Sequence, residues 1–149
     1  MDVGEARARF VEARVARLAT ADADGRPHLV PIVFALLDDR LYSAIDLKPK
    51  AHAGPNVRLR RLDNIRANPA VSVLVDDYTE DWQQLWWARA DGTARVIAAT
   101  DAEATRAIAA LTQRYPQYRD APPPGPVIAI AVDRWSGWVA QSYPHSANG

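Results

Sequence analysis

Three short apolar segments separated by tight polar turns constrain the fold of this chain most. Val15, Leu18 and Ala19 indicate a first strand, the turn sequence DADGRP follows it, and His28 to Leu37 indicates a second strand. The residues DDR then connect to a third strand over Leu41 to Leu47. Because such short connections join antiparallel neighbours, the sequence predicts a β-meander.

The rest of the chain adds strands and helices. Apolar residues recur at helical spacing over Asp2 to Arg14, Val57 to Ala67 and Thr100 to Tyr115, the last with a capping box of Thr100 and Glu103. Further strands are expected over VSVLVDDY, over the aromatic segment DWQQLWWARADGTARVIA with a break at Asp91-Gly92, and over VIAIAV. About six antiparallel strands in one domain over residues 1–149, with a tail that frays from about residue 142, favour a small β-barrel with helical decoration.

The composition excludes several functions. The 18 Lys and Arg balance the 18 Asp and Glu, so no global field recruits nucleic acid or a membrane surface. Without cysteine there is no thiolate chemistry, and the three histidines lack metal-ligand spacing, so we expect no metal site. No apolar run approaches the ~18 residues of a membrane span, and the N-terminus lacks a signal-peptide core. We expect a cytoplasmic protein.

Positive charges gather in one corner of the sequence. The only two lysines, Lys48 and Lys50, directly follow the third predicted strand, and Arg58, Arg60 and Arg61 lie at the start of the helix that comes next. Arginine forks, lysine point charges and helix N–H groups together suit a phosphate or carboxylate. The alternative is a solvated basic helix face.

A helical wheel divides the helix of this corner into two faces. The apolar stripe consists of Leu59, Leu62 and Ile65 with Arg58 inside it, and the opposite side carries Arg60, Arg61 and Asn64. This arrangement predicts that Arg61 is exposed.

The five tryptophans and the candidate acids allow two interpretations each. Trp86 and Trp87 are adjacent, so in a strand they face opposite sides and at most one reaches the core. The other covers a subunit contact or stacks on a planar ligand. The carboxylates of the segment DDYTED read as a solvated turn, and Tyr42, Ser43 and Tyr78 are candidate hydrogen-bond donors to a ligand. Nothing places a catalytic triad, so no catalytic residue is assigned.

Several segments in order are similar to one family. VARLATADADGRPHLVPIVFAL resembles the opening two strands of the pyridoxamine 5′-phosphate oxidase-like, flavin-binding split β-barrel proteins. RLDNIRANPAVSVLV resembles that group's basic-x-x-Asn-aliphatic pattern followed by Asn-Pro, and LWWARADGTARVI resembles its strand ending in Gly-x-Ala. Two further motifs, KPK and RWSGW, are similar to the actinobacterial branch of this family that uses the deazaflavin coenzyme F420. The resemblance covers about residues 7 to 140.

The resemblance implies a fold, an assembly and a cofactor site. The fold is mainly β with helices, a six-stranded antiparallel split β-barrel (FMN-binding split barrel), and two copies form a homodimer with the cofactor at their interface. The cofactor phosphate would meet Arg61, joined by Arg58, Arg60, Lys48 and Lys50. The ring would lie along the second and third strands, near Pro31, Ile32, Val33, Tyr42, Ser43 and Ala44, and Trp87 would offer its side chain to the ring.

The implied function is hydride transfer between coenzyme F420 and a small-molecule acceptor. An FMN-dependent oxidoreductase of the same fold and a non-enzymatic flavin or deazaflavin carrier or sensor are the alternatives. RWSGWVAQ stands where the parent oxidases have a C-terminal Arg-and-Pro ending, so pyridoxamine phosphate oxidation is not expected. The substrate stays unnamed.

Overall fold

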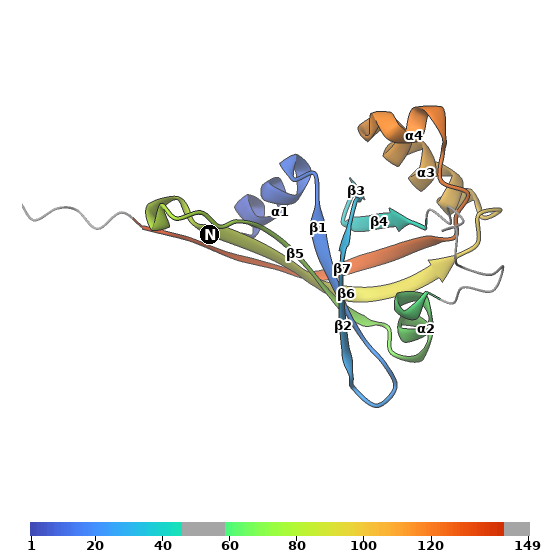
Figure 1. Cartoon of the computed structure of the whole chain (residues 1–149), viewed down its shortest axis with the longest axis horizontal. Helices are drawn as coiled ribbons and strands as arrows, with labels where there is room; N and C mark the ends of the chain where they lie inside the picture. The colour runs from blue at the N-terminus through green and yellow to red at the C-terminus, as the bar shows by residue number, and fades with distance from the viewer. Residues whose placement is uncertain (46–58, 142–149) are drawn as a thin grey trace, which may run out of the picture.

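A computed structural model describes residues 1–45 and 59–141 of the chain (Figure 1). The helices are α1 (Val3–Glu12), α2 (Arg60–Ala67), α3 (Ala102–Arg114) and α4 (Pro116–Asp120), with a 3-10 turn, η1, at Trp82–Gln84. The strands are β1 (Ala16–Ala21), β2 (Pro27–Ile32), β3 (Ala35–Leu37), β4 (Arg40–Ala44), β5 (Ala70–Asp77), β6 (Trp86–Ile97) and β7 (Val127–Val139). The predictions for Lys48, Lys50, Arg58 and the tail from residue 142 lie outside the described residues.

The described strands form one antiparallel sheet in the order β2-β1-β5-β6-β7-β4-β3. Its two edge strands, β2 and β3, are joined only by Val33 and Phe34. A flat seven-stranded sheet would hold its edge strands about 29 Å apart. The chain from Ile32 to Ala35 spans at most about 11 Å. The sheet must therefore curl until its edges approach, which makes an open barrel, mainly β with helices.

The number of strands differs from the six predicted. The apolar segment His28 to Leu37, predicted as one strand, is divided between β2 and β3, which brings the described strands to seven. The pattern of apolar residues continues through Val33 and Phe34, so local sequence gives no sign of the break. The break arises because the chain crosses there from one edge of the sheet to the other.

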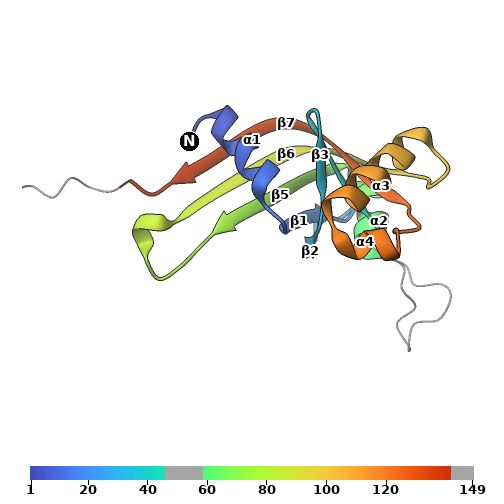
Figure 2. The same ribbon diagram turned by 90° about the horizontal axis from the view of Figure 1, so that it is seen from above.

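The core consists of two clusters of buried side chains. The first fills the barrel and includes Phe10 of α1, whose ring contacts the edges of Phe34 and Trp135 at centroid distances of 5.9 and 5.1 Å. The second lies between α3 and strands β3, β4 and β7, and includes Leu111 and Val127. α1 and α2 lie on either side of the strands, and α3 and α4 sit together at one end (Figures 1 and 2). Small alanines on the inner face of α3 allow it to approach the sheet closely.

Strands β5, β6 and β7 continue beyond the barrel as a long arm that ends at η1 (Figures 1 and 2). Trp86 lies partly buried against the core with the Arg9 guanidinium 4.5 Å from its ring centroid, whereas Trp87 faces the other side of the sheet. The expectation that only one of this pair reaches the core is therefore met. The predicted break at Asp91-Gly92 is a β-bulge instead, and β6 continues through it because Gly92 lets the β7 backbone come close.

The third predicted helix is shifted at both ends. Asp101, not Thr100, caps α3: its carboxylate accepts a hydrogen bond from the Glu103 N–H at 2.8 Å. The predicted capping box is therefore wrong, because the Glu103 side chain binds strand residues instead. The helix ends at Arg114, and Pro116 opens the unpredicted helix α4.

Candidate functional site

The start of α2 carries a cation whose hydrogen-bonding capacity is not used within the described residues. The helix begins after Leu59, which makes no side-chain cap, so no capping side chain satisfies the first N–H groups of the helix. Arg60 is exposed, but Arg61 is half-buried, and its Nε is enclosed without a hydrogen-bond partner among the described residues. Burial lowers the pKa of the Arg61 guanidinium. An anion bound beside Arg61 would therefore stabilise the start of α2.

The face of α2 turned toward the barrel is more polar than the helical wheel predicts. Asn64 is buried, and its Nδ2 donates to Thr20 Oγ1 at 3.0 Å. Thr20 pairs with His28 in the β1–β2 register, and the His28 Nδ1 is also enclosed without a partner among the described residues. The exposure predicted for Arg61 is wrong, because α2 contacts both β1 and β6 and side chains outside its apolar stripe are therefore covered as well.

The predicted ring-contacting residues fall into different environments. On β2, Pro31 is exposed and Ile32 is buried, and Val33 follows half-buried. The three predicted residues of β4, which are Tyr42, Ser43 and Ala44, are all buried. The phenol of Tyr42 is turned toward α3, where it donates to Glu103 Oε1 at 2.8 Å. Whether a ring contacts these positions stays a prediction.

Glu103 joins α3 to the sheet. Its carboxylate accepts hydrogen bonds from Arg95 of β6, from Arg40 Nη1 of β4 at 2.8 Å and from the Tyr42 hydroxyl. The hydrogen bonds from Arg95 contribute most to lowering the pKa of Glu103 to about 2. Burial, together with the carboxylate of Glu103, raises the pKa of Tyr42. This buried phenol therefore remains protonated near neutral pH.

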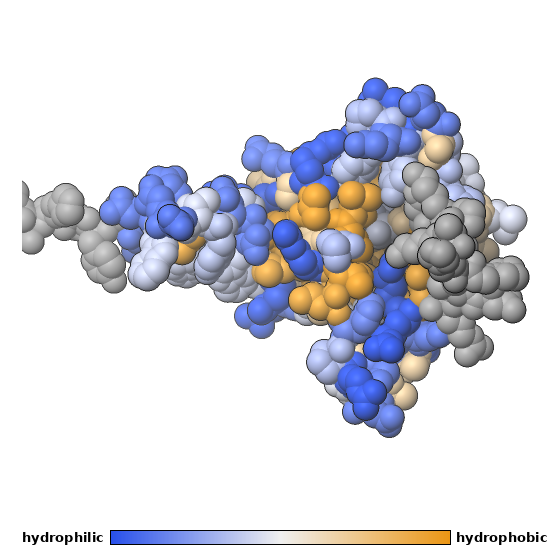
Figure 3. All heavy atoms as spheres, in the orientation of Figure 1, coloured by the Kyte–Doolittle hydropathy of each residue, from blue (hydrophilic) through white to orange (hydrophobic). Residues whose placement is uncertain are grey.

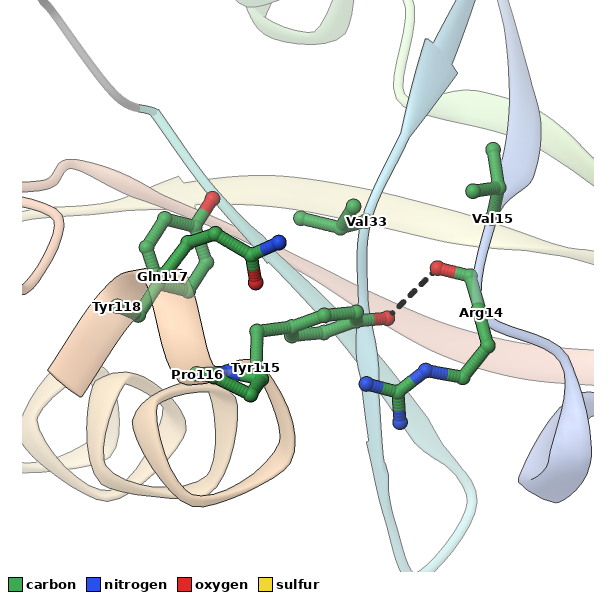
Figure 4. Close-up of a pocket in the computed structure, with 7 residues that line it drawn as sticks. All are labelled: Arg14, Val15, Val33, Tyr115, Pro116, Gln117 and Tyr118. Carbon is green, nitrogen blue, oxygen red and sulfur yellow. Dashed lines mark hydrogen bonds between the residues drawn. The ribbon is translucent and has the colours of Figure 1, made fainter.

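A cavity of about 400 Å³ opens beside Val33 (Figure 4). The side chains around it come from the start of β1, the β2–β3 junction and the start of α4, and they are Arg14, Val15, Val33, Tyr115, Pro116, Gln117 and Tyr118. Of these residues only Val33 was predicted as a site residue from the sequence, because α4, which completes the cavity, was not predicted. The available signal was Tyr-Pro at the end of a helix, since proline favours the first position of a new helix.

Trp87 lies on the outward face of the sheet. It borders a shallow hollow of about 310 Å³ with Leu74, Asp76, Tyr78 and Arg89, and the Arg89 guanidinium lies 5.4 Å from its ring centroid. The strand registers place Pro31 in one row with Arg17, Leu74 and Arg89, so Pro31 and Trp87 share this outward face.

Trp87 is also far from α2 in the same protomer. It lies six residues along β6 from Thr93, which pairs with Ala70 just after α2. This separation corresponds to about 20 Å. The structure therefore does not bring Trp87 and Arg61 together within one chain.

Two further classes of site were examined in the described part of the chain. No group of three or more His, Asp or Glu side chains there is arranged to hold a metal ion. None of its helices combines the length and the apolar character that a membrane crossing requires.

The sequence matches the family described as pyridoxamine 5′-phosphate oxidase over residues 3–139, and the chain belongs to this family. No curated protein matches the sequence significantly. Among solved structures, a FAD-binding protein from Mesorhizobium loti is similar, with 23% identity, a TM-score of 0.70 and coverage of 92% of this chain and 94% of the other. A conserved hypothetical protein from Mycobacterium tuberculosis has 22% identity and a TM-score of 0.74, covering 100% and 92%.

The heme storage protein HutZ from Vibrio cholerae shares the fold as well. It has 18% identity and a TM-score of 0.69, and the match covers 93% of this chain and 95% of that protein. At these identities the likeness establishes the fold alone. The fold thus occurs in proteins with different ligands, and the function must be argued from the site.

Proposed function

We propose that this protein binds a flavin or deazaflavin and uses it as an oxidoreductase, with coenzyme F420 favoured over FMN. The observation that carries the proposal is Arg61, a half-buried cation at a helix start whose Nε has no partner among the described residues. Burying a charge without a partner is costly, so an anionic group there would stabilise the folded protein. A cofactor phosphate has the charge and the acceptor oxygens that this place lacks.

The choice of F420 rests on the number of cations near the site. Arg60 adds an exposed charge beside Arg61, and we expect Lys48, Lys50 and Arg58 to add three more. Such a cluster suits the phosphodiester and the anionic oligoglutamate tail of the deazaflavin better than the single phosphate of FMN. When bound, the reduced deazaflavin supplies a hydride from its C5 carbon. The chain's own residues would hold the anionic end and position the ring.

A homodimer is part of the proposal, because Trp87 and Arg61 are too far apart in one protomer to meet the same ring and phosphate. Trp87 would instead reach the cofactor bound at Arg61 of the second copy. The outward sheet face supports this arrangement: Figure 3 shows an apolar patch over the middle of this view, and Val15 and Leu29 are exposed by 44% and 66%. Exposed apolar patches of this kind commonly mark interfaces.

The binding step is tested by titrating the purified protein with F420 or FMN and following tryptophan fluorescence. We compare Arg61→Gln with Arg66→Gln, a matched change on the exposed side of the same helix. Loss of one charge-assisted hydrogen bond should weaken binding about tenfold or more in Arg61→Gln. Arg66→Gln should bind nearly as the parent does. Equal affinities of the two variants would contradict the phosphate role of Arg61.

Two measurements separate the alternatives. A preference for FMN over F420 in the titration would identify the FMN-dependent form of the fold. Anaerobic mixing of the loaded protein with electron acceptors, followed by cofactor absorbance, then divides an enzyme from a carrier or sensor. Sedimentation of the parent protein reports whether two copies associate, and a monomer that still binds cofactor tightly would contradict the role of Trp87 across the interface.

A further inference from the structure

The cavity beside Val33 has the features of a second binding site, which shares Val33 with the residues expected to contact the cofactor ring. Its volume of about 400 Å³ lies within the range of small-molecule pockets. Its walls are two valines and two tyrosines, with Arg14 and Gln117 as polar groups at the margin (Figure 4). Arg60 and Arg61 of α2 are not among the described residues that line it.

The two tyrosines give the cavity flat, fixed walls. The rings of Tyr115 and Tyr118 meet edge to face at a centroid distance of 6.0 Å. The Tyr115 hydroxyl accepts from the Phe34 N–H at 3.2 Å and from Arg114 Nε at 3.2 Å, and it lies 3.0 Å from the carbonyl oxygens of Arg14 and Phe34. A hydroxyl has one proton and two lone pairs, so this one has no capacity left for a ligand. Tyr115 therefore serves as a rigid aromatic surface.

Arg14 brings an uncompensated charge to this surface. Its guanidinium lies 4.7 Å from the Tyr115 ring centroid, and one of its nitrogens donates to the Arg114 carbonyl oxygen at 2.8 Å. No carboxylate of the described residues forms an ion pair with Arg14. A guanidinium has five N–H groups, so most of them remain available to an anionic oxygen. The amide of Gln117 is directed into the cavity toward Val33 and adds a donor and an acceptor (Figure 4).

We propose that this cavity binds a planar aromatic or conjugated carboxylate, with its ring against Tyr115, Tyr118 and Val33 and its carboxylate on Arg14. Flat apolar walls select a planar body, and the Arg14 guanidinium, which has no carboxylate partner among the described residues, selects a negatively charged group. Val33 is also one of the positions at which the sequence analysis expects the cofactor ring. A conjugated carboxylate bound here would also be the hydride acceptor of the proposed function: a hydride from the reduced cofactor would add to the β-carbon of its C=C bond and a proton from water to the α-carbon, which leaves a saturated carboxylate and oxidised cofactor. This role rests on the proposed function, whereas binding of the carboxylate does not.

The test uses the full-length protein without added cofactor and three probes measured by calorimetry. These are 2-naphthoate, its neutral amide 2-naphthamide, and cyclohexanecarboxylate, which has the charge but not the planar ring. We expect 2-naphthoate to bind, and we expect the affinity of each of the other two probes to be lower by about tenfold or more. Equal binding of all three would overturn the proposal.

Two pairs of variants locate the site. Arg14→Met should weaken 2-naphthoate binding about tenfold and leave 2-naphthamide unchanged, whereas Arg106→Met, on the exposed surface of α3, should change neither. Gln117→Trp should fill the cavity and abolish binding of both probes, whereas Gln113→Trp, at an exposed position near the end of α3, should not. Because Gln117 is exposed, this change leaves the core intact. Parent-like binding in Gln117→Trp would refute the assignment.

The outcomes also separate this inference from the proposed function. Binding of 2-naphthoate by a protein that binds neither F420 nor FMN would support the cavity and refute the cofactor proposal. Cofactor binding without any binding of 2-naphthoate would do the reverse. If both bind, reduced cofactor should be consumed only by conjugated carboxylates that compete with 2-naphthoate.

Discussion

Replacing Glu103 with alanine should destabilise the protein measurably, because this one carboxylate ties α3 to two strands that are not neighbours. β7 lies between β4 and β6. Tyr42 and Arg95 both pair with Ala129 of β7, so the three residues form one row across the strands. The small side chain of Ala129 leaves room for Glu103 to reach both Tyr42 and Arg95. Loss of the carboxylate removes all of these contacts together.

The size of the effect follows from the burial of each partner. The side chains of Arg40 and Arg95 are 52% and 50% exposed, so solvent screens both ion pairs, and the pair with Arg95 contributes only about 0–1 kcal/mol. Tyr42 is 5% exposed, and its hydroxyl left without a partner costs about 1–3 kcal/mol. We therefore expect Glu103→Ala to lower the free energy of unfolding by about 2–4 kcal/mol. For a chain of this length that corresponds to a decrease in Tm of about 5–15 °C.

The pH dependence of the same contact has a definite sign. The pKa of Glu103 is about 2 in the folded protein, against an ordinary value of 4.5. A lowered pKa means that the carboxylate stabilises the fold fully above pH 4.5, and that this stability is lost as the pH falls from 4.5 toward 2. The deficit of Glu103→Gln relative to the parent should therefore shrink between about pH 5 and about pH 3.

The assay is urea unfolding followed by tryptophan fluorescence at several pH values. Glu80→Gln, in an exposed loop, is the control and should stay within about 0.5 kcal/mol of the parent. The reasoning is refuted if Glu103→Ala is as stable as this control, or if the deficit of Glu103→Gln does not change with pH. A double-mutant cycle with Arg95→Met would then show whether the two side chains interact at all.

Two further substitutions test the core and the bulge. Phe10→Ala removes a fully buried ring that contacts Phe34 and Trp135, so urea unfolding should show a loss of about 3–5 kcal/mol, and a loss below about 1 kcal/mol would mean that α1 is not docked as described. Gly92→Ala would place a Cβ against the carbonyl oxygen of Ala131, so its Tm should fall clearly, whereas a parent-like Tm would contradict the close approach of β6 and β7 at the bulge.

Much of the secondary structure could be predicted because it depends on local patterns. Alternation over Val71, Val73 and Val75 gives β5 its buried face, as expected from period two. The helical spacing of Ala104 and Leu111 correctly predicts the inner face of α3. These patterns depend only on which face of a helix or strand is buried. They can therefore be interpreted without knowing which other element covers that face.

The capping of α3 and the exposure of Arg61 could not be predicted for a different reason. Thr100 and Asp101 both suit a helix cap, and the outcome depends on Glu103, which Arg40 of β4 and Arg95 of β6 draw away from the helix end. The burial of Arg61 depends on how α2 lies across β1 and β6. Both are decided by contacts between separate helices and strands, which a helical wheel does not contain.

The cavity beside Val33 follows from the closure of the barrel. Phe34 lies in the link between the two edge strands, where none of the described strands pairs with its backbone. Buried backbone groups require partners, and here the Tyr115 hydroxyl lies within hydrogen-bonding distance of both the N–H and the carbonyl oxygen of Phe34. Satisfying the link thus holds the start of α4 against the barrel, with the Tyr115 ring facing Val33. The residue that closes the fold therefore also builds one wall of the proposed ligand site, so a variant such as Tyr115→Phe would affect both at once, whereas Gln117→Trp separates them.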